Sequence, residues 1–393
     1  MQQHRIVVLG AGYAGAGAAG RLARRLHRDD VRITLVNAEP DFVERVRLHQ
    51  LATGHDLARR PLRDLFAGTG VEVRIARVTA VDADRKEVTL TTGDGDGAGD
   101  GAGVLPYDTL VYALGSGWDD RGVPGAAAHA DQIASRPGAL RLRGRLAALA
   151  AGRPVVVVGG GLTGLEAATE IAETRPDLAV TLVVRGGLGA EFSPRGRAHL
   201  RRVTARLGIT VREHTEVTAV GEDRVTTADG TALPAAVTLW TTGFAVHPIA
   251  KATTLEVSDT GRIIVDGTLR AASHPDVYAV GDAALVEGAG GRPLRMSCAS
   301  GLPMSWQAAD AIAARLTGGR MPHVSFRYVN RCVSLGRREA LIQYVTADDR
   351  AVRAALTGRT AARYKELVCK GAAWSVAHPT FGLPGGHRRT TAA

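Results

Sequence analysis

Short apolar runs that end in glycine recur along the 393-residue chain. Residues 5–36 hold one such run, RIVVLG, followed by an alanine-rich stretch and a second apolar run, VRITLVN. This order predicts a strand, a glycine turn, a helix and a second strand, which form one βαβ unit. Residues 154–184 repeat the pattern, with AVTLVV as the closing strand. Because βαβ units build parallel sheets, the repeat predicts an α/β fold with two such sheets.

The rest of the chain carries further strand and helix patterns. Alternating apolar and polar positions predict antiparallel strands over residues 71–92, and the low-complexity loop after them, residues 93–103, can bury nothing. Additional strands are expected over residues 107–115, 233–243, 276–282, 323–335 and 339–348. Helices are expected from about Pro303 to Leu316 and, as a basic segment, over residues 359–370.

The two glycine turns share the pattern GxGxxG. In such a turn the first glycine takes a tight conformation, the second lets the backbone approach a pyrophosphate, and the third allows close packing of helix and strand. The N-terminus of the following helix attracts the negative charge. A single GxGxxG is weak evidence, whereas two copies in complete βαβ units are strong evidence for two bound dinucleotides. The glycines concerned are Gly10, Gly12, Gly15, Gly159, Gly161 and Gly164.

The paired motifs predict that hydride passes between two dinucleotides held by one chain. We expect FAD as a resident cofactor at the first motif and a nicotinamide that comes and goes at the second. At the end of the second strand of each unit, a carboxylate binds a ribose 2′-hydroxyl, whereas an arginine suits a 2′-phosphate. The first unit ends at Asn37, with Glu39 close by, and the second ends at Arg185. Arg185 favours NADPH over NADH, unless it is only a solvated strand-end residue.

Charge and cysteine content limit the partners and the compartment. The net charge of +10 comes almost wholly from scattered arginines, and no basic patch is interleaved with aromatic residues, so no nucleic-acid partner is expected. We expect no signal peptide and no transmembrane helix. The cysteines, Cys298, Cys332 and Cys369, are far apart in the sequence and offer neither a CxxC pair nor a metal-ligand set. These features favour a cytoplasmic protein without a metal site.

Five motifs carry a resemblance to a known family: GAGYAG, YALGS, GGGLTGLE, WTTGF and VYAVGDAA, in this order. The chain resembles flavoproteins with two dinucleotide-binding domains, and among them type II NADH:quinone oxidoreductases and ferroptosis-suppressor or apoptosis-inducing-factor-like proteins. The C-terminal CVSLGRREALIQYV and LVCKGAAWSVAHP look like the interface region of this group. The resemblance implies two Rossmann-like domains, for FAD and NAD(P), and a C-terminal α+β interface region. The implied boundaries are 1–117 and 255–318 for FAD, 118–254 for NAD(P) and 319–393 for the interface.

The resemblance also implies which residues bind the cofactors. Gly10–Gly15 would cradle the FAD pyrophosphate, and Gln50 and Val78 would lie along FAD. Asp282 would bind the ribityl chain, and a helix opening near Pro303 would aim its positive end at the flavin pyrimidine edge. The full set is Gly10, Gly12, Tyr13, Ala14, Gly15, Asn37, Glu39, Gln50, Val78, Gly115, Gly159, Gly161, Leu162, Thr163, Gly164, Arg185, Gly243, Gly281, Asp282, Met304 and Ser305.

The catalytic and acceptor-binding candidates lie on two expected helices. Glu166 matches an acid that in this group lies near the nicotinamide–flavin contact, although a helix first-turn glutamate favoured by the dipole is an equal alternative. Disulfide reductases of the superfamily need a dithiol, which this chain lacks. Type II quinone reductases open a helix with an Ala-Gln pair, and the corresponding residues here are Ser305 and Trp306, followed by Gln307. Trp306 and Gln307 are therefore the candidate substrate residues, and Trp306 could stack on a flat acceptor or wall off the pocket.

The resulting hypothesis is an FAD-dependent NAD(P)H dehydrogenase that passes two electrons to a small planar acceptor, with a quinone as first choice. Three alternatives stay open: a tailoring dehydrogenase or oxidase of specialised metabolism, a redox-responsive signalling protein that holds FAD and NAD(P)H, and electron transfer to a ferredoxin-like partner. The basic segment 359–374 leaves open a peripheral contact with a membrane, beside packing on its own domain or in a homodimer.

Overall fold

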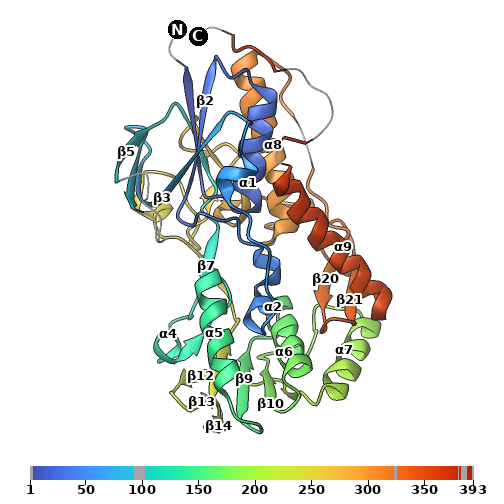
Figure 1. The fold of residues 1–393 in the computed structure, drawn as a ribbon. Coiled ribbons are helices and arrows are strands. Elements are labelled where there is room, and N and C mark those ends of the chain that lie inside the picture. The colour runs from blue at the N-terminus through green and yellow to red at the C-terminus, as the bar shows by residue number, and fades with distance from the viewer. Residues whose placement is uncertain (1–2, 93–101, 323–324, 379, 382–386, 392–393) are drawn as a thin grey trace.

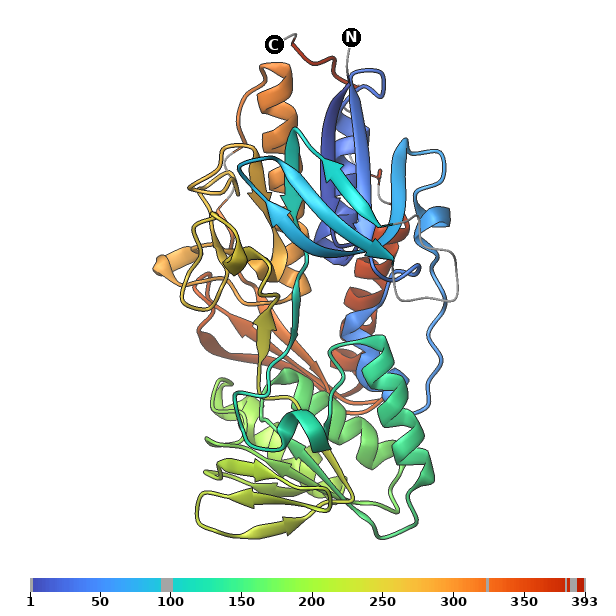
Figure 2. The same ribbon diagram turned by 90° about the vertical axis from the view of Figure 1, so that its left-hand side faces the viewer.

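The computed structural model describes residues 3–92, 102–322, 325–378, 380–381 and 387–391. Two parallel sheets occupy opposite ends of an elongated molecule, and a C-terminal segment lies along one side of both (Figures 1 and 2). This arrangement confirms the predicted α/β fold with two parallel sheets. The loop expected over residues 93–103 falls almost wholly outside the described residues.

The first sheet contains the N-terminal βαβ unit. The bounds of its elements are β1 His4–Leu9, α1 Tyr13–Arg25, β2 Val31–Asn37, α2 Leu48–Ala52, α3 Leu62–Leu65, β3 Val71–Asp82, β4 Glu87–Thr92, β5 Gly103–Pro106, β6 Thr109–Tyr112, β18 Val277–Ala279 and α8 Cys298–Thr317. The strand order is β18-β6-β1-β2-β3-β4-β5; the strands from β18 to β3 run parallel, and β4 and β5 are added antiparallel at one edge. Helices α1 and α8 lie side by side along this sheet (Figure 1).

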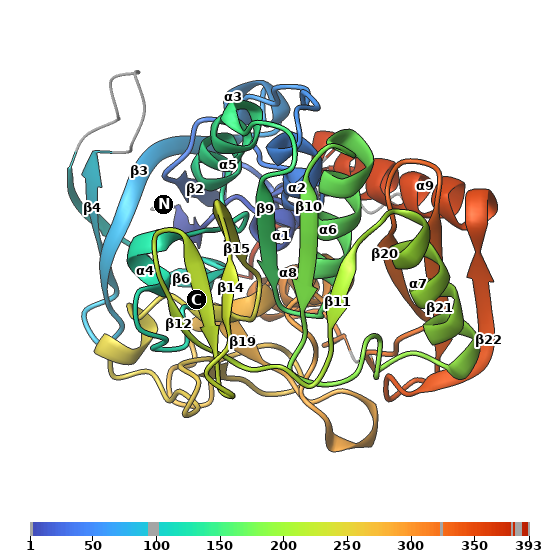
Figure 3. The ribbon, with the colours of Figure 1, turned by 90° about the horizontal axis from the view of Figure 1, so that it is seen from below.

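The second sheet repeats the arrangement with its own helices. The bounds are α4 Ala126–His129, β8 Ala130–Asp131, α5 Arg136–Ala148, β9 Pro154–Val158, α6 Leu162–Thr174, β10 Ala179–Val183, α7 Pro194–Arg206, β11 Thr210–Arg212, β12 Val217–Val220, β13 Arg224–Thr227, β14 Ala232–Pro234 and β15 Val237–Trp240. The sheet has the order β11-β10-β9-β15-β8, all parallel, and Figure 3 shows β11, β10, β9 and β15 side by side. Strands β12, β13 and β14 form a separate antiparallel sheet. In β9, Val155 and Val157 join one apolar core, while Val156 and Val158 join another. Burial on both faces explains why this strand is continuously apolar.

The regions built on the two sheets are called the first and second parts. The chain passes twice between these parts, and the C-terminal region contacts both. Strand β7, Ser116–Trp118, pairs antiparallel with β16, Phe244–Val246, and β17, Ile263–Ile264, pairs with β19, Ala284–Leu285. The C-terminal elements are β20 Asn330–Ser334, β21 Ala340–Val345, β22 Ala351–Thr357 and α9 Gly358–Ala377. Val333 and Leu341 extend the core of the second part, whereas α9 packs against both β21 and α1. The C-terminal region thus contacts both parts.

Several predicted element ends are wrong. Helix α8 begins at Cys298, and Pro303, where the helix was expected to open, is its sixth residue. Ser297 precedes the first turn, and its carbonyl accepts the N–H of Gly301. A proline at this depth removes only one intrahelical bond, so the helix continues through it. The first two residues of the strand expected over 323–335 lie outside the described residues, and among residues 325–335 the strand is confined to β20. The helix expected to end near residue 370 runs to Ala377.

Candidate functional site

The first glycine turn, between β1 and α1, has the shape of a phosphate cradle. Gly10 has a φ of 91°, and a Cβ there would lie 2.5 Å from the carbonyl oxygen of Ala113. A Cβ on Gly15 would lie 1.8 Å from the carbonyl oxygen of Gly10, so only glycine allows this approach of α1 to β1. By contrast, a Cβ on Gly12 would have no atom within 4 Å. Gly12 therefore faces open space at the helix N-terminus, where a pyrophosphate would approach.

The second glycine turn, between β9 and α6, repeats this geometry. Gly159 has a φ of 121°, and a Cβ there would lie 2.6 Å from Oγ1 of Thr241. A Cβ on Gly164 would lie 1.9 Å from the carbonyl oxygen of Gly159, and one on Gly161 would again have no atom within 4 Å. Both turns meet the three demands of a dinucleotide site, so the residues present fit two such ligands.

The end of β2 supports the first turn. The side-chain oxygen of Asn37 accepts the N–H of Ala11 at 2.9 Å, and its side-chain nitrogen donates to the carbonyl of Glu39 at 2.8 Å. The Asn37 amide therefore fixes the glycine turn, which leaves the half-buried Glu39 as the carboxylate at this strand end. Tyr13 is buried and packs edge-on against Phe42 at 5.0 Å between ring centroids, so its ring belongs to the core.

The ends of β6 and β18 lie next to the first glycine turn, on the side opposite to β2. Gly115 follows β6 with a φ of 69°, and Gly281 follows β18 with a φ of 70°. A Cβ on Gly281 would lie 3.1 Å from Cβ of Ala14, and one on Gly301 in α8 would lie 3.5 Å from the same atom. The hydroxyl of Ser116 donates to Asp282 at 2.6 Å. The start of α1, the end of β18 and the first turns of α8 thus converge, with Asp282 beside them.

The second turn has fewer polar neighbours. Leu162 and Thr163 form the first turn of α6. Arg185 is exposed beyond the end of β10. Gly243 follows β15, and a Cβ there would lie 2.7 Å from the guanidinium of Arg121, which donates to the carbonyl of Thr242. These residues come from the carboxyl ends of neighbouring parallel strands, where dinucleotides bind in such sheets.

Glu166 is buried on α6 in a cluster that four elements build. Lys365 of α9 approaches its carboxylate at 3.0 Å. The backbone N–H and the hydroxyl of Ser334, at the end of β20, each donate to the same oxygen at 3.1 Å. Nδ1 of His49, on α2, lies 3.8 Å from the other oxygen. This geometry does not fit a solvated first-turn glutamate, because the side chain is enclosed and paired with a cation.

Burial and pairing set the charges of this cluster. Burial by itself would raise the pKa of Glu166, but Lys365 and the hydrogen bond from Ser334 outweigh it and hold that pKa below its usual value. Burial would lower the pKa of Lys365, but the adjacent carboxylate raises it. Burial lowers the pKa of His49 to about 4. The cluster is therefore an ion pair beside a neutral imidazole at pH 7.

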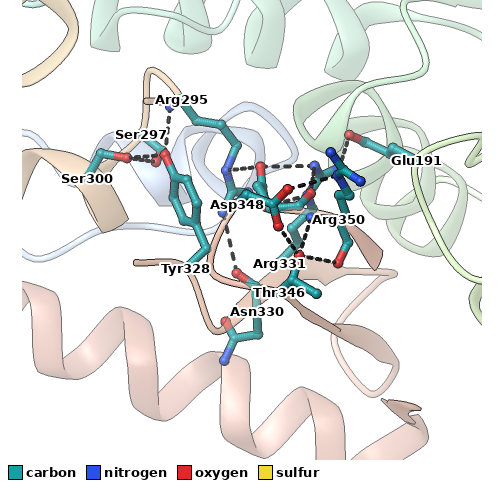
Figure 4. Close-up of polar contacts among 11 residues, drawn as sticks. Glu191, Arg295, Ser297, Ser300, Tyr328, Asn330, Arg331, Thr346, Asp348 and Arg350 are labelled. Carbon is teal, nitrogen blue, oxygen red and sulfur yellow. Dashed lines mark hydrogen bonds and ion pairs between the residues drawn. The ribbon is translucent and has the colours of Figure 1, made fainter. Parts of the chain in front are cut away.

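The opening of α8 is held by the segment before β20 (Figure 4). The hydroxyl of Tyr328 accepts the backbone N–H of Arg295 at 2.7 Å and lies 2.9 Å from Oγ of Ser300. The Arg295 guanidinium lies 4.2 Å over the Tyr328 ring and 3.0 Å from Asp349. Arg331 forms a second ion pair with Asp349. These contacts fix the position of the positive end of α8, which lies at Ser297 and Cys298.

The predicted helix-opening residues lie elsewhere on α8. Met304 is buried in the core, and Ser305 packs on α1, where a Cβ on Gly17 would lie 2.7 Å from its hydroxyl. Trp306 is 43% exposed, with the Arg21 guanidinium 6.0 Å from its ring. Gln307 is buried and donates to the carbonyl of Gly267 at 2.5 Å.

The expectation that Ser305 and Trp306 open the helix is therefore wrong, because α8 starts at Cys298–Ala299. Trp306 and Gln307 also point to different surroundings and are not brought together. Their role toward a substrate stays a prediction.

Gln50 and Val78 lie on different elements. Gln50 is buried in α2, and its side-chain oxygen accepts from Arg47 at 3.3 Å. Val78 is half-buried in β3, three residues beyond Ile75, which pairs with Asn37. Val78 therefore lies on the strand beside β2, whereas Gln50 lies near the second part. Their contacts with FAD stay predictions.

Sequence reasoning missed Lys365, Ser334 and His49. The available signal was the helical spacing of Lys365 and Cys369 on one face of the basic C-terminal segment. The cysteines, which are distant in sequence, come within electrostatic reach of one another beside Lys365, and all are free thiols. Burial raises the pKa of Cys332 to about 11 and also raises those of Cys298 and Cys369. Such thiols are poor nucleophiles. Within the described residues no group of side chains could hold a metal ion.

The two glycine turns have the geometry that a dinucleotide-binding turn requires, one at each sheet. Residues 4–313 match the family model for pyridine nucleotide-disulphide oxidoreductases, and the chain belongs to that family. Within it, this protein is a NAD(P)H-dependent flavin oxidoreductase.

The relatives agree with this assignment. An NADH dehydrogenase-like protein of Mycobacterium tuberculosis is 32% identical over 327 residues, which cover 76% of this chain and 78% of the relative. The type II NADH:quinone oxidoreductase NdhA of the same organism is 28% identical over 329 residues, which cover 74% of this chain and 68% of the relative. The structure of NDH2 from Plasmodium falciparum in complex with NADH shares the fold, with a TM-score of 0.79, 14% identity and coverage of 96% and 97% of the two chains.

Proposed function

We propose that this protein binds FAD at the Gly10–Gly15 turn and NAD(P)H at the Gly159–Gly164 turn and reduces a quinone. The observation that carries the proposal is one cradle geometry repeated at the carboxyl ends of two parallel sheets, each with open space at its middle glycine. When bound, FAD accepts hydride from a nicotinamide and gives two electrons to an acceptor.

The chain's own residues bind and orient the cofactors. The middle glycines, Gly12 and Gly161, leave room for the pyrophosphates, and the helix N-termini beside them supply N–H donors. Asp282, held by Ser116, is the polar group we assign to the ribityl chain. The positive end of α8, anchored by Tyr328, would stabilise negative charge on the reduced flavin.

Glu166 is the residue we assign to proton handling. Reduction of a quinone by NAD(P)H consumes hydride and one further proton to give NAD(P)⁺ and quinol, so a proton from water must reach the acceptor. Glu166 and Lys365 form a buried charged pair, and Cys298, at the opening of α8, lies within electrostatic reach of both. We place the acceptor between the opening of α8 and this pair, where a carboxyl group can exchange a proton.

The nucleotide preference and the membrane contact are part of the proposal. Arg185, exposed at the end of β10, would pair with a 2′-phosphate, so we assign NADPH as the better donor. Within the described residues no helix has the length and apolar character to cross a bilayer. The outer face of α9 nevertheless exposes Leu367 at 69% and Trp374 at 45% beside the cations Arg363 and Lys370. We assign this face to an anionic membrane surface, from which a lipid-soluble quinone could enter.

Rapid mixing of the FAD-loaded protein tests the proposal. The protein is reduced anaerobically with NADPH and then mixed with decylubiquinone or with oxygenated buffer. We expect the quinone to reoxidise the flavin at least tenfold faster than oxygen. Glu166→Gln should slow the quinone reaction and leave reduction by NADPH unchanged. A quinone no faster than oxygen would instead favour a tailoring oxidase, and slow reoxidation by both would favour a redox-responsive binding protein.

A further inference from the structure

Glu170 is a second buried carboxylate on α6, one helical turn after Glu166. Its side chain is fully buried, and within the described residues neither of its oxygens has a hydrogen-bond partner. Such a group is costly to bury, because a carboxylate loses its hydration without gaining donors. It belongs neither to the glycine turns nor to the contacts of Glu166. A native structure that keeps such a group calls for an explanation.

The nearest groups connect Glu170 with solvent. Nε2 of His55, in the segment after α2, lies 3.2 Å from one oxygen of Glu170. This nitrogen is buried and has no hydrogen-bond partner among the described residues, whereas the His55 side chain as a whole is 41% exposed. One edge of the imidazole therefore faces water while the other faces the buried carboxylate. A histidine in this position can take up a proton on one side and release it on the other.

Other charged groups around Glu170 are few. Nε of Arg337, between β20 and β21, lies 3.8 Å from the same oxygen. On α6 itself Glu173 and Glu166 lie one turn to either side, and both act on Glu170 electrostatically. Arg143 of α5 acts electrostatically on His55.

Burial, opposed by Arg337 and helped by the two glutamates, raises the pKa of Glu170 to about 7. Burial also lowers the pKa of His55, so its imidazolium gives up a proton readily. Glu170 can hold a proton near neutral pH.

We propose that His55 and Glu170 form the path by which a proton from solvent reaches Glu166. This inference rests on the proposed function, because quinone reduction consumes one proton from water. His55 takes a proton from water at its exposed edge and gives the proton on Nε2 to the Glu170 carboxylate. The Glu170 carboxylic acid then protonates Glu166, one turn away on the same face of α6, directly or through one water. Each transfer moves one proton and no electrons and leaves His55 with its remaining proton on Nδ1. The path is reset when Nδ1 releases that proton to water and the ring, rotated toward solvent, takes up a proton from water on Nε2.

Kinetic variants test the path. In His55→Ala and Glu170→Gln, reduction of the FAD-loaded protein by NADPH should be unchanged, because hydride transfer does not use the path. Reoxidation by decylubiquinone should slow at least tenfold. Added imidazole should restore much of the rate to His55→Ala, whose site is open to solvent, but not to Glu170→Gln. Glu173→Gln is the matched control, because Glu173 contacts the same arginine segment but lies on the side of Glu170 away from Glu166.

An infrared titration gives a readout that needs no turnover. The protonated carboxyl band of the protein should contain a component with a midpoint near neutral pH in wild type, and this component should be missing from Glu170→Gln. In Glu173→Gln the component should remain, with a lower midpoint, because Glu173 helps to raise the pKa of Glu170. The proposal is overturned if both path variants reoxidise with quinone at the wild-type rate, or if imidazole restores neither. It is also overturned if Glu170→Gln keeps the titrating band. If Glu170→Gln fails to fold, His55→Ala with imidazole decides alone. Failure of wild type to react with quinone would instead refute the proposed function, while the infrared result would still stand.

Discussion

The ammonium of Lys365 lies 3.0 Å from the carboxylate of Glu166, and both side chains are largely buried. The pair joins the C-terminal helix α9 to the helix that follows the second glycine turn. Its partners Ser334 and His49 come from two further elements. The ion pair therefore connects the C-terminal region with the second part of the molecule, beside α2.

Removing the cation should destabilise the protein. In Lys365→Met, Glu166 is left buried with an uncompensated charge, so we expect a loss of about 3–5 kcal/mol in the free energy of unfolding at pH 8. Paired Glu166 has a lowered pKa, so the pair stabilises the fold above the usual glutamate pKa and this contribution is lost as pH falls through the lowered value. The loss in Lys365→Met should accordingly shrink at acid pH. Urea unfolding at pH 8 and at acid pH measures this loss in the free energy of unfolding.

A double variant is the control for this prediction. Lys365→Met with Glu166→Gln removes both charges and should recover most of the lost stability. A double variant as unstable as Lys365→Met would show that the ion pair is not the cause.

Substitutions at the middle glycines, Gly12 and Gly161, should impair cofactor binding without affecting the stability of the fold. A Cβ at Gly12 or Gly161 meets no protein atom within 4 Å, so alanine there should leave the thermal unfolding of the FAD-free protein nearly unchanged. Gly12→Ala should lower the FAD content, because the methyl group enters the cradle, whereas Gly161→Ala should keep the FAD and raise the KM for the nicotinamide. Absorbance per protein and steady-state kinetics measure the two effects. Equal loss of FAD in both variants would contradict the assignment of the two sites.

The nucleotide preference should depend on Arg185. A glutamate at this strand end repels a 2′-phosphate and can accept a hydrogen bond from a 2′-hydroxyl. We therefore expect Arg185→Glu to lower kcat/KM for NADPH about tenfold or more relative to NADH, which corresponds to roughly 1.4 kcal/mol. An unchanged ratio would remove Arg185 from the nucleotide site.

Glu170 should make the protein less stable as pH rises. Its pKa is raised in the folded state to about 7 from 4.5, so the folded state holds the proton more tightly than the unfolded chain between these values. The free energy of unfolding should therefore fall by roughly 2–3 kcal/mol across this window through this one group. Glu170→Gln, which mimics the neutral acid, should lack that fall and be more stable than wild type at pH 8. Parallel pH profiles for the two proteins would contradict this.

The sequence predicts the local parts of this structure better than the contacts between distant segments. Gly10 and Gly159 could be recognised because each glycine, strand and helix are adjacent in the chain. The start of α8 was misplaced because Pro303 is favoured at a helix N-terminus, while the actual first turns depend on Tyr328 and on packing of Gly301 against Ala14. Lys365 could not be paired with Glu166 because nothing in either segment encodes the tertiary fold that joins them.

The most direct test of the account is the spectrum of the purified protein before and after anaerobic NADPH. We expect a yellow protein with about one FAD per chain, whose visible absorbance is bleached by NADPH and returns on addition of a quinone. A protein that is colourless and does not take up added FAD would contradict the central claim that the first glycine turn holds a flavin. A yellow protein that neither NADPH nor NADH can bleach would contradict the claim that the second turn delivers a nicotinamide to it.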